Sequence, residues 1–254
     1  MGKITLETML RGSQRSIRMI RNKKILESAL DTKVNVTSDN LALFPELNLI
    51  VNRIKKSGNT SLVLFFHDLI GGDSLEPHAV NDEKSRRSIR GVDLSSWDNL
   101  SESKSFVCVR NPYFRAISGF LEKVGRGENT EFQAYGGYGD PTVSGFETFL
   151  DDLANSEWRS VDRHFWPQTN LLFQPAKRFY YIARLETLSD DMNAFLETMG
   201  IDGNKAASLR KPHKTEQQMC GKITNSSKRD DLLSPKAKVI IEKLYGEDFA
   251  TFGY

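Results

Sequence analysis

Two short segments of this chain carry the residue types that bind phosphate groups, and the first is Lys55–Ser61, with the sequence KKSGNTS. It stands between an apolar run and an apolar helical segment. A strand that ends at such a turn and continues as a helix directs backbone N–H groups and a helix N-terminus at an anion. The sequence therefore predicts an anion site formed by Lys56, Ser57, Gly58, Asn59, Thr60 and Ser61.

The second segment is 105–120, SFVCVRNPYFRAISGF, an apolar strand that ends in Arg110. Asn111 is a suitable N-cap for the helix that follows, and Pro112 suits the first helical position. Ser118 lies two turns further along this helix. Arg110 and Ser118 predict a second phosphate site, and a ligand with phosphate-type groups at both ends would satisfy both sites.

The composition of the chain bounds what it can be. With 254 residues and ordinary hydrophobic and charged fractions, the chain is long enough for one domain with a full core. A net charge of +2 does not indicate a nucleic-acid partner. Cys108 lies within an apolar strand and is expected to be a buried free thiol. No apolar run predicts a signal peptide or an integral membrane segment, so we expect a soluble, cytoplasmic protein.

Strands and helices alternate along the chain. Apolar strands are predicted at 47–54, 106–110 and 178–183, with helical segments between them. This order predicts an α/β fold, a three-layer domain with a mainly parallel central sheet flanked by helices. We place the boundary between an N-terminal helical extension, residues 1–46, and the main domain, residues 47–254.

Two further segments have a distinctive composition. Residues 3–30 are predicted to be helical, with four arginines on one face: Arg11, Arg15, Arg18 and Arg21. That face is either solvated or a site for an acidic partner. The segment 125–141 contains five glycines and predicts a mobile loop that gates a site.

The lysine segment is not a Walker A loop. That loop requires a lysine after its glycines, whereas Lys56 precedes Gly58 and no glycine precedes it. A nucleoside triphosphatase is therefore disfavoured. An ordinary polar turn between a strand and a helix remains the alternative for this motif taken alone.

The order of the two motifs resembles that of the sulfotransferases that use 3′-phosphoadenosine 5′-phosphosulfate (PAPS). The motifs read K-[ST]-G-x-T-S and R-[DN]-P-x-x-R-x-x-S, each after an apolar strand. Downstream segments are similar to the Golgi carbohydrate sulfotransferases that modify chondroitin, dermatan and heparan-type glycans. They are His164–Gln168, Gln174-Pro175, Tyr181–Leu188, Asp191, Leu244-Tyr245, Asp248-Phe249 and Phe252–Tyr254.

The resemblance implies a P-loop-like fold and an enzyme that transfers a sulfonate group from PAPS to an acceptor hydroxyl on a carbohydrate, leaving the bisphosphate PAP. It implies that Lys56 acts at the bridging oxygen, that residues 57–61 hold the 5′ end, and that Arg110 and Ser118 bind the 3′-phosphate. Arg184 and Lys211 are further candidates for cofactor binding. No residues have metal-ligand spacing. The alternatives are a kinase-like phosphoryl transferase and a non-catalytic nucleotide-binding protein.

The acceptor hydroxyl requires a base, and a histidine suits this role near neutral pH. We favour His78, which lies in the polar stretch between the two motifs, where several relatives place their base. His164 is the second candidate, and a carboxylate such as Glu76 is the third. His67 falls within the apolar helix and is expected to be structural.

Overall fold

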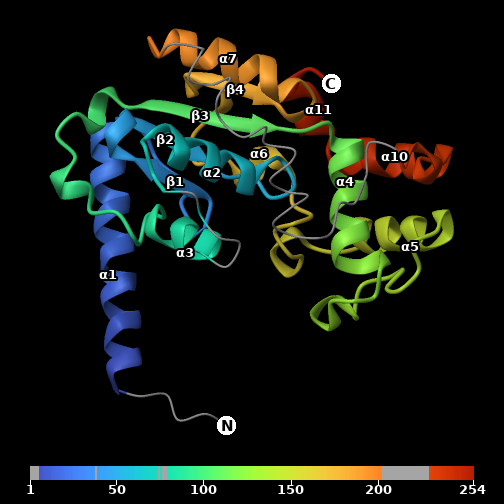
Figure 1. Cartoon of the computed structure of the whole chain (residues 1–254). Coiled ribbons are helices and arrows are strands. Elements are labelled where there is room, and N and C mark those ends of the chain that lie inside the picture. The colour runs from blue at the N-terminus through green and yellow to red at the C-terminus, as the bar shows by residue number, and fades with distance from the viewer. Residues whose placement is uncertain (1–5, 38, 74, 76–78, 202–228) are drawn as a thin grey trace.

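The computed structural model describes residues 6–37, 39–73, 75, 79–201 and 229–254. Its centre is a four-stranded sheet in the order β1-β2-β3-β4 (Figure 1). Strand β1 (Leu41–Phe44) is antiparallel to β2 (Leu49–Asn52), whereas β3 (Lys104–Val109) and β4 (Tyr181–Arg184) continue the sheet in parallel. The predicted α/β, P-loop-like architecture with a mainly parallel sheet is confirmed.

Helices cover both faces of this sheet and make the three layers. Neighbouring strand residues such as Phe106 and Val107 alternate between the two faces, and both are fully buried. The Phe106 face packs against α2 and α7, and the opposite face packs against α1, α6 and α11. The bounds of these helices are α1 (Leu6–Ala29), α2 (Asn59–Leu69), α6 (Gln168–Leu171), α7 (Leu188–Thr198) and α11 (Gly246–Phe252).

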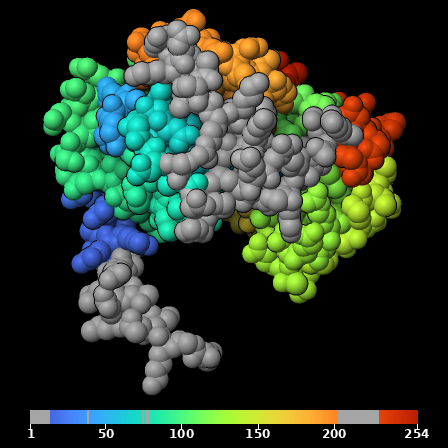
Figure 2. All heavy atoms as spheres, in the orientation of Figure 1, coloured from blue at the N-terminus to red at the C-terminus, as the bar shows by residue number. Residues whose placement is uncertain are grey.

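A second hydrophobic core lies beside the sheet, between α4 (Pro112–Phe120), α5 (Val143–Ala154) and α10 (Pro235–Leu244). Its centre is aromatic, and the Phe149 ring packs edge-on against Phe165 at 4.9 Å between centroids. In Figure 2 this helical lobe, green to red, occupies the opposite side of the molecule from the blue and cyan N-terminal elements. The molecule therefore has two packed parts joined where β3 leads into α4.

Strand β1 is absent from the sequence-based prediction. It has only four residues, all buried, so it shows neither the alternation nor the length that identifies a strand. Its hydrogen bonds to β2 bring residues 41–44 into the sheet. The domain boundary between residues 46 and 47 stays a prediction. Cys108 is buried and free, as expected.

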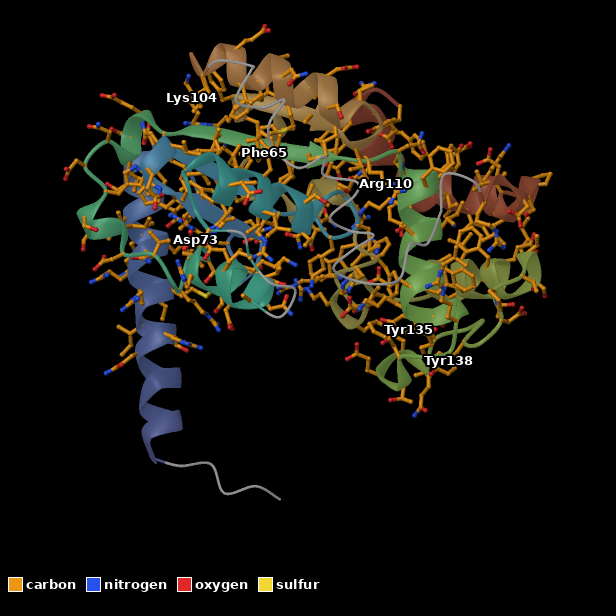
Figure 3. The ribbon with its side chains drawn as sticks, viewed as in Figure 1. Phe65, Asp73, Lys104, Arg110, Tyr135 and Tyr138 are labelled. Carbon is orange, nitrogen blue, oxygen red and sulfur yellow. The ribbon has the colours of Figure 1, made fainter. Side chains whose placement is uncertain are left out.

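The glycine-rich segment 125–141 packs on the helical core, contrary to the predicted gating loop. Phe132 in this segment is only 4% exposed and belongs to that core. The Tyr138 hydroxyl donates a hydrogen bond to the Gly127 carbonyl at 2.7 Å, and Figure 3 shows Tyr138 close to Tyr135. The aromatic residues bury apolar surface and so pack the segment against the helical core. A prediction based on the glycine content does not take this burial into account.

Helix α3 (Ala79–Arg86) is anchored to α2 by a buried carboxylate. Glu83 contacts the His67 ring at 2.9 Å and accepts a hydrogen bond from Arg87 at 2.8 Å. The second ring nitrogen of His67 lies 3.1 Å from the Asp73 carbonyl oxygen. Both nitrogens of this buried ring are thus engaged by protein groups, which confirms the structural role expected for His67.

We predict that Glu83→Gln lowers the free energy of unfolding by roughly 1.5–3 kcal/mol at pH 7, the usual contribution of a hydrogen bond to a charged group. Burial alone would raise the pKa of Glu83, but Arg87 and His67 lower it overall. This stabilisation is therefore present above the unfolded-state pKa of about 4.3 and is lost as the pH falls through the lower folded-state pKa. Urea unfolding at pH 7 and pH 3 measures it, with the exposed Glu102→Gln as control. A difference between wild type and variant that stays constant down to pH 3 would contradict this assignment.

Candidate active site

The loop Lys55–Ser61, here called the lysine loop, follows β2 and leads into α2. Lys56 and Gly58 both have left-handed backbone conformations, with φ of 68° and 72°. A Cβ atom at Gly58 would also lie 3.1 Å from a methyl group of Leu185. Gly58 is the N-cap of α2 and offers no capping side chain, and a helix N-terminus of this kind suits an anion.

Arg110 lies where β3 ends and α4 begins (Figure 3). Because β2 and β3 are parallel, the lysine loop and Arg110 emerge at the same edge of the sheet. The Arg110 guanidinium donates a hydrogen bond to the Lys56 carbonyl oxygen at 3.2 Å. Asn111 caps α4 by accepting a hydrogen bond from the Tyr113 N–H, and Pro112 is the first helical residue, as predicted. The structure brings the two predicted phosphate sites together.

A buried amide, Gln168, joins these two segments. Its Oε1 accepts hydrogen bonds from the Ser57 hydroxyl at 3.0 Å and from the Arg110 N–H at 2.9 Å. Its Nε2 donates to the Arg110 carbonyl oxygen at 2.8 Å. The Asp248 carboxylate in turn accepts from the backbone N–H groups of Gln168 and Thr169, and so caps α6. The sequence showed Gln168 and Asp248 only as parts of family-like segments and gave them no role.

One face of α4 is turned toward the lysine loop. Arg115, only 2% exposed, donates hydrogen bonds to the carbonyl oxygens of Lys55 at 3.2 Å and Trp166 at 2.7 Å. Ser118 is buried three residues later, so it lies on the same face of the helix. This places Ser118 on the side of α4 that contains the site. Arg115 was visible in the sequence motif, but its contact with the loop is a tertiary contact that spacing does not reveal.

Glu122 forms an ion pair with Lys56. It lies in the π-helical turn Leu121–Gly125, and such turns occur frequently at functional sites. Burial would raise the pKa of Glu122, but the Lys56 ammonium lowers it overall. Glu122 is therefore ionised at neutral pH and holds the Lys56 side chain at the loop. No sequence pattern identified Glu122.

His164 is paired with Asp162, with 2.5 Å between its Nδ1 and the carboxylate. Burial lowers the pKa of His164, and the positive charge of Lys55 adds to this effect although Asp162 opposes it. Burial would raise the pKa of the partly exposed Asp162, but hydrogen bonds from His164 lower it to about 2. The His164 ring is therefore neutral at pH 7. When Nδ1 donates to Asp162, Nε2 carries the lone pair that accepts a proton.

Arg184 lies at the same sheet edge, but it contacts the C-terminal segment. Its guanidinium donates to the Phe252 carbonyl oxygen at 2.7 Å and lies 5.0 Å from the centre of the Tyr254 ring. Glu186 does not pair with it directly; its carboxylate accepts from the Asn111 N–H and the Tyr254 hydroxyl. The aromatic end of the chain therefore packs at this edge of the sheet.

The predicted sites His78 and Lys211 lie outside the described residues, as does the alternative Glu76. Within the described parts of the chain, no group of three or more histidine, cysteine or acidic side chains has an arrangement that could hold a metal ion. The same residues include no helix that is both long and apolar enough to cross a membrane.

A loop that leads into a helix after one parallel strand and an arginine after the next define a P-loop-like α/β protein. Comparison with protein families makes this specific. The model of the sulfotransferase family matches residues 39–254, so this chain belongs to that family. Searches among curated proteins and among solved structures gave no significant match.

We predict that inorganic sulfate raises the melting temperature of Gln168→Leu less than that of the wild type. The reason is that the lysine loop loses its connection to the end of β3. Thermal-shift titrations measure this difference. Leucine has a similar volume but leaves Ser57 and Arg110 unpaired, which costs roughly 1–3 kcal/mol of stability per buried group. Gln174→Leu is the matched control, since Gln174 is also buried and hydrogen-bonded, to Ser105 and Arg178. If both variants lose stability but keep the same sulfate response as wild type, Gln168 does not organise the anion site.

Proposed function

We propose that the protein transfers a sulfonate group from PAPS to a hydroxyl group, and that the acceptor is a carbohydrate, as in the Golgi carbohydrate sulfotransferases that the sequence resembles. The observation that carries the proposal is the Gln168 bridge, which holds the lysine loop and Arg110 at one sheet edge. Membership of the sulfotransferase family supports the reaction type.

The residues present fit this donor. Gly58 offers no capping side chain at the N-terminus of α2, and the backbone N–H groups of residues 57–61 with the Thr60 and Ser61 hydroxyls are assigned to the 5′ end. Arg110 and the buried Ser118 are assigned to the 3′-phosphate. Arg184 and Lys211 remain proposed contacts to the nucleotide. The bound donor supplies the sulfonate; the protein binds, orients and neutralises charge.

Lys56 has the charge and the position to stabilise negative charge that develops on the leaving oxygen. A fixed ammonium and oriented N–H groups act strongly where water is excluded, and the Lys56 side chain is only 14% exposed. Glu122 holds this ammonium at the loop before a ligand arrives. A donor anion then competes with Glu122 for Lys56, so the carboxylate tunes how firmly the site binds anions.

We propose His78 as the general base. Among the described residues, His164 is the strongest alternative, because Asp162 fixes its orientation and its ring is neutral. A kinase-like reaction is not supported by any specific contact, since Lys56 precedes the loop glycine.

We predict that the wild-type protein binds adenosine 3′,5′-bisphosphate at least tenfold more tightly than AMP or ATP, as measured by titration calorimetry. A charge-assisted hydrogen bond contributes roughly 1.5–3 kcal/mol, so Arg110→Ala should remove most of the preference over AMP. Arg178→Ala is the control, because Arg178 precedes β4 and its guanidinium donates to the Leu30 carbonyl oxygen, away from the lysine loop. Equal affinities of the wild type for the bisphosphate and AMP would remove the support for a 3′-phosphate site.

We predict that His78→Ala retains bisphosphate binding and thermal stability but loses roughly 100- to 10,000-fold in the rate of PAP release from PAPS with an acceptor, the usual contribution of a positioned base. The rate of the wild type should fall on acidification as the imidazole becomes protonated. An active His78→Ala together with an inactive, folded and bisphosphate-binding His164→Ala would move the role to His164. In that case the acid limb should lie below the ordinary histidine pKa of about 6.5, because the pKa of His164 is lowered.

A further inference from the structure

A basic groove of about 720 Å³ lies between α1 and α3, next to the lysine loop but outside the proposed nucleotide site. Two acidic side chains, Asp39 and Asp82, border it. Its basic side chains outnumber them threefold and are Arg15, Arg18, Arg53, Lys84, Arg86 and Arg90. This concentration of positive charge contrasts with a net charge of only +2 for the whole chain.

The wall of the groove formed by α1 is fixed in place by polar contacts. The Arg18 guanidinium donates to the Gly91 carbonyl oxygen at 3.2 Å, and Arg21 pairs with Asp93 at 2.6 Å. The fully buried Asn22 amide donates to the carbonyl oxygens of Ile89 and Val92, both at 2.8 Å. Two arginines of the face predicted from the sequence, Arg18 and Arg21, therefore contact the body of the protein, and Arg15 lines the groove.

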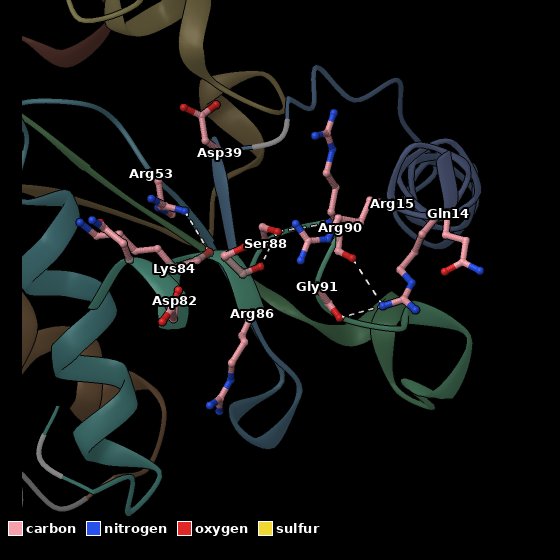
Figure 4. A pocket seen from close by; sticks show the side chains of 13 residues that line it. Gln14, Arg15, Asp39, Arg53, Asp82, Lys84, Arg86, Ser88, Arg90 and Gly91 are labelled. Carbon is pink, nitrogen blue, oxygen red and sulfur yellow. Dashed lines mark hydrogen bonds between the residues drawn. The ribbon is translucent and has the colours of Figure 1, made fainter. Parts of the chain in front are cut away.

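The other end of the groove reaches the lysine loop. Arg53, which is 8% exposed, donates a hydrogen bond to the Asn59 side chain at 2.7 Å. The Lys84 ammonium donates to the Thr60 hydroxyl at 2.7 Å. Figure 4 shows Arg53 and Lys84 at one end of the groove and Arg15 on α1 at the other. Two residues that line the groove therefore contact the first turn of α2.

The groove and Arg110 lie on opposite sides of the lysine loop. Because the sheet order is β1-β2-β3-β4, Arg110 at the end of β3 lies on one side of the loop that follows β2. Asp39, which borders the groove, immediately precedes the strand on the other side, β1. A nucleotide that spans the lysine loop and Arg110 therefore does not occupy the groove.

We propose that this groove binds a linear acidic polysaccharide, whose sulfate or carboxylate groups pair with the arginines while one hydroxyl reaches the lysine loop. This assignment of the acceptor rests on the proposed sulfotransferase function. The groove lining contains no aromatic side chain on which nucleic-acid bases would stack. It does contain Gln14, Asn81 and Ser85, whose polar groups suit sugar hydroxyls.

The α1 wall is a feature of this chain beyond the family match. That match begins at residue 39, whereas Arg15 and Arg18 lie before it. The family model therefore does not cover the α1 wall, which supplies three of the thirteen lining residues, Gln14, Arg15 and Arg18. The recognition of a polyanion is assigned here to α1 together with the basic residues of the family-matched part that face it.

The test is titration calorimetry with a size-fractionated, sulfated heparin octasaccharide, using a neutral dextran octasaccharide and a disaccharide of the heparin type as comparisons. The variants are Arg15→Ala/Arg86→Ala and, as a charge-matched control on α10, Lys238→Ala/Lys243→Ala. All four side chains belong to exposed residues. We expect the wild type to bind the sulfated octasaccharide but not the dextran, with affinity that falls as salt is raised.

The groove variant should bind the sulfated octasaccharide about tenfold more weakly, given the contribution of up to about 1 kcal/mol from each exposed charge pair. The control should be unchanged, and the disaccharide, too short to span the groove, should not distinguish the variants. Unchanged octasaccharide affinity in the groove variant would overturn the site. Tighter binding of a single-stranded DNA of equal charge through the same arginines would overturn the polysaccharide assignment.

Affinity for adenosine 3′,5′-bisphosphate is measured on the same samples and should be equal in both variants. In one outcome, the wild type fails to bind the bisphosphate while oligosaccharide binding still depends on Arg15 and Arg86. That result would refute the sulfotransferase proposal and the acceptor role, but it would leave the polyanion site in place. Normal bisphosphate binding without a groove effect would refute the groove alone.

Discussion

The arrangement of this site depends on one buried amide. Gln168 accepts hydrogen bonds from Ser57 and Arg110 with its oxygen and donates to the Arg110 carbonyl with its nitrogen. A carboxylate lacks the donor and an apolar side chain lacks both groups, so glutamine is the residue type that satisfies these partners. Because Asp248 fixes the backbone of Gln168, the separation between the lysine loop and Arg110 is set by the packed core before a ligand binds. Binding two anionic groups of one ligand then requires little reorganisation.

Charge balance is the second constraint on the site. Lys56 and Arg115 are held within a poorly hydrated region, where unpaired cations are costly. Arg115 is satisfied by backbone carbonyl groups, which can accept its hydrogen bonds in every ligand state. Lys56 is satisfied by Glu122, a side chain that can release it. The structure thus separates a permanent cation that shapes the loop from an exchangeable one that is available for chemistry.

The sequence predicts those features that depend on residues close together along the chain, and it does not predict those that depend on residues far apart. The strand, lysine loop and helix, and the Asn111 cap of α4, are specified by neighbouring residues and were predicted correctly. Glu122 and Gln168 act through contacts 66 and more than 100 residues away in sequence, which no local pattern encodes. The glycine-rich segment was predicted wrongly because its glycines were given more weight than the buried Phe132. The roles of His78 and Lys211 stay predictions.

The lysine loop is the junction of two binding directions with different physical character. Toward Arg110, the contacts are short, buried and directional, as suits a ligand of one fixed size. Toward α1, six cations are distributed along a groove and half of them are exposed, and such long-range, salt-sensitive attraction suits a polymer that binds in several registers. The family match covers the first direction completely and the second only in part. In our proposal, the family-matched part therefore determines the chemistry, and α1 acts together with the basic residues opposite it to determine which acceptor is brought to the lysine loop.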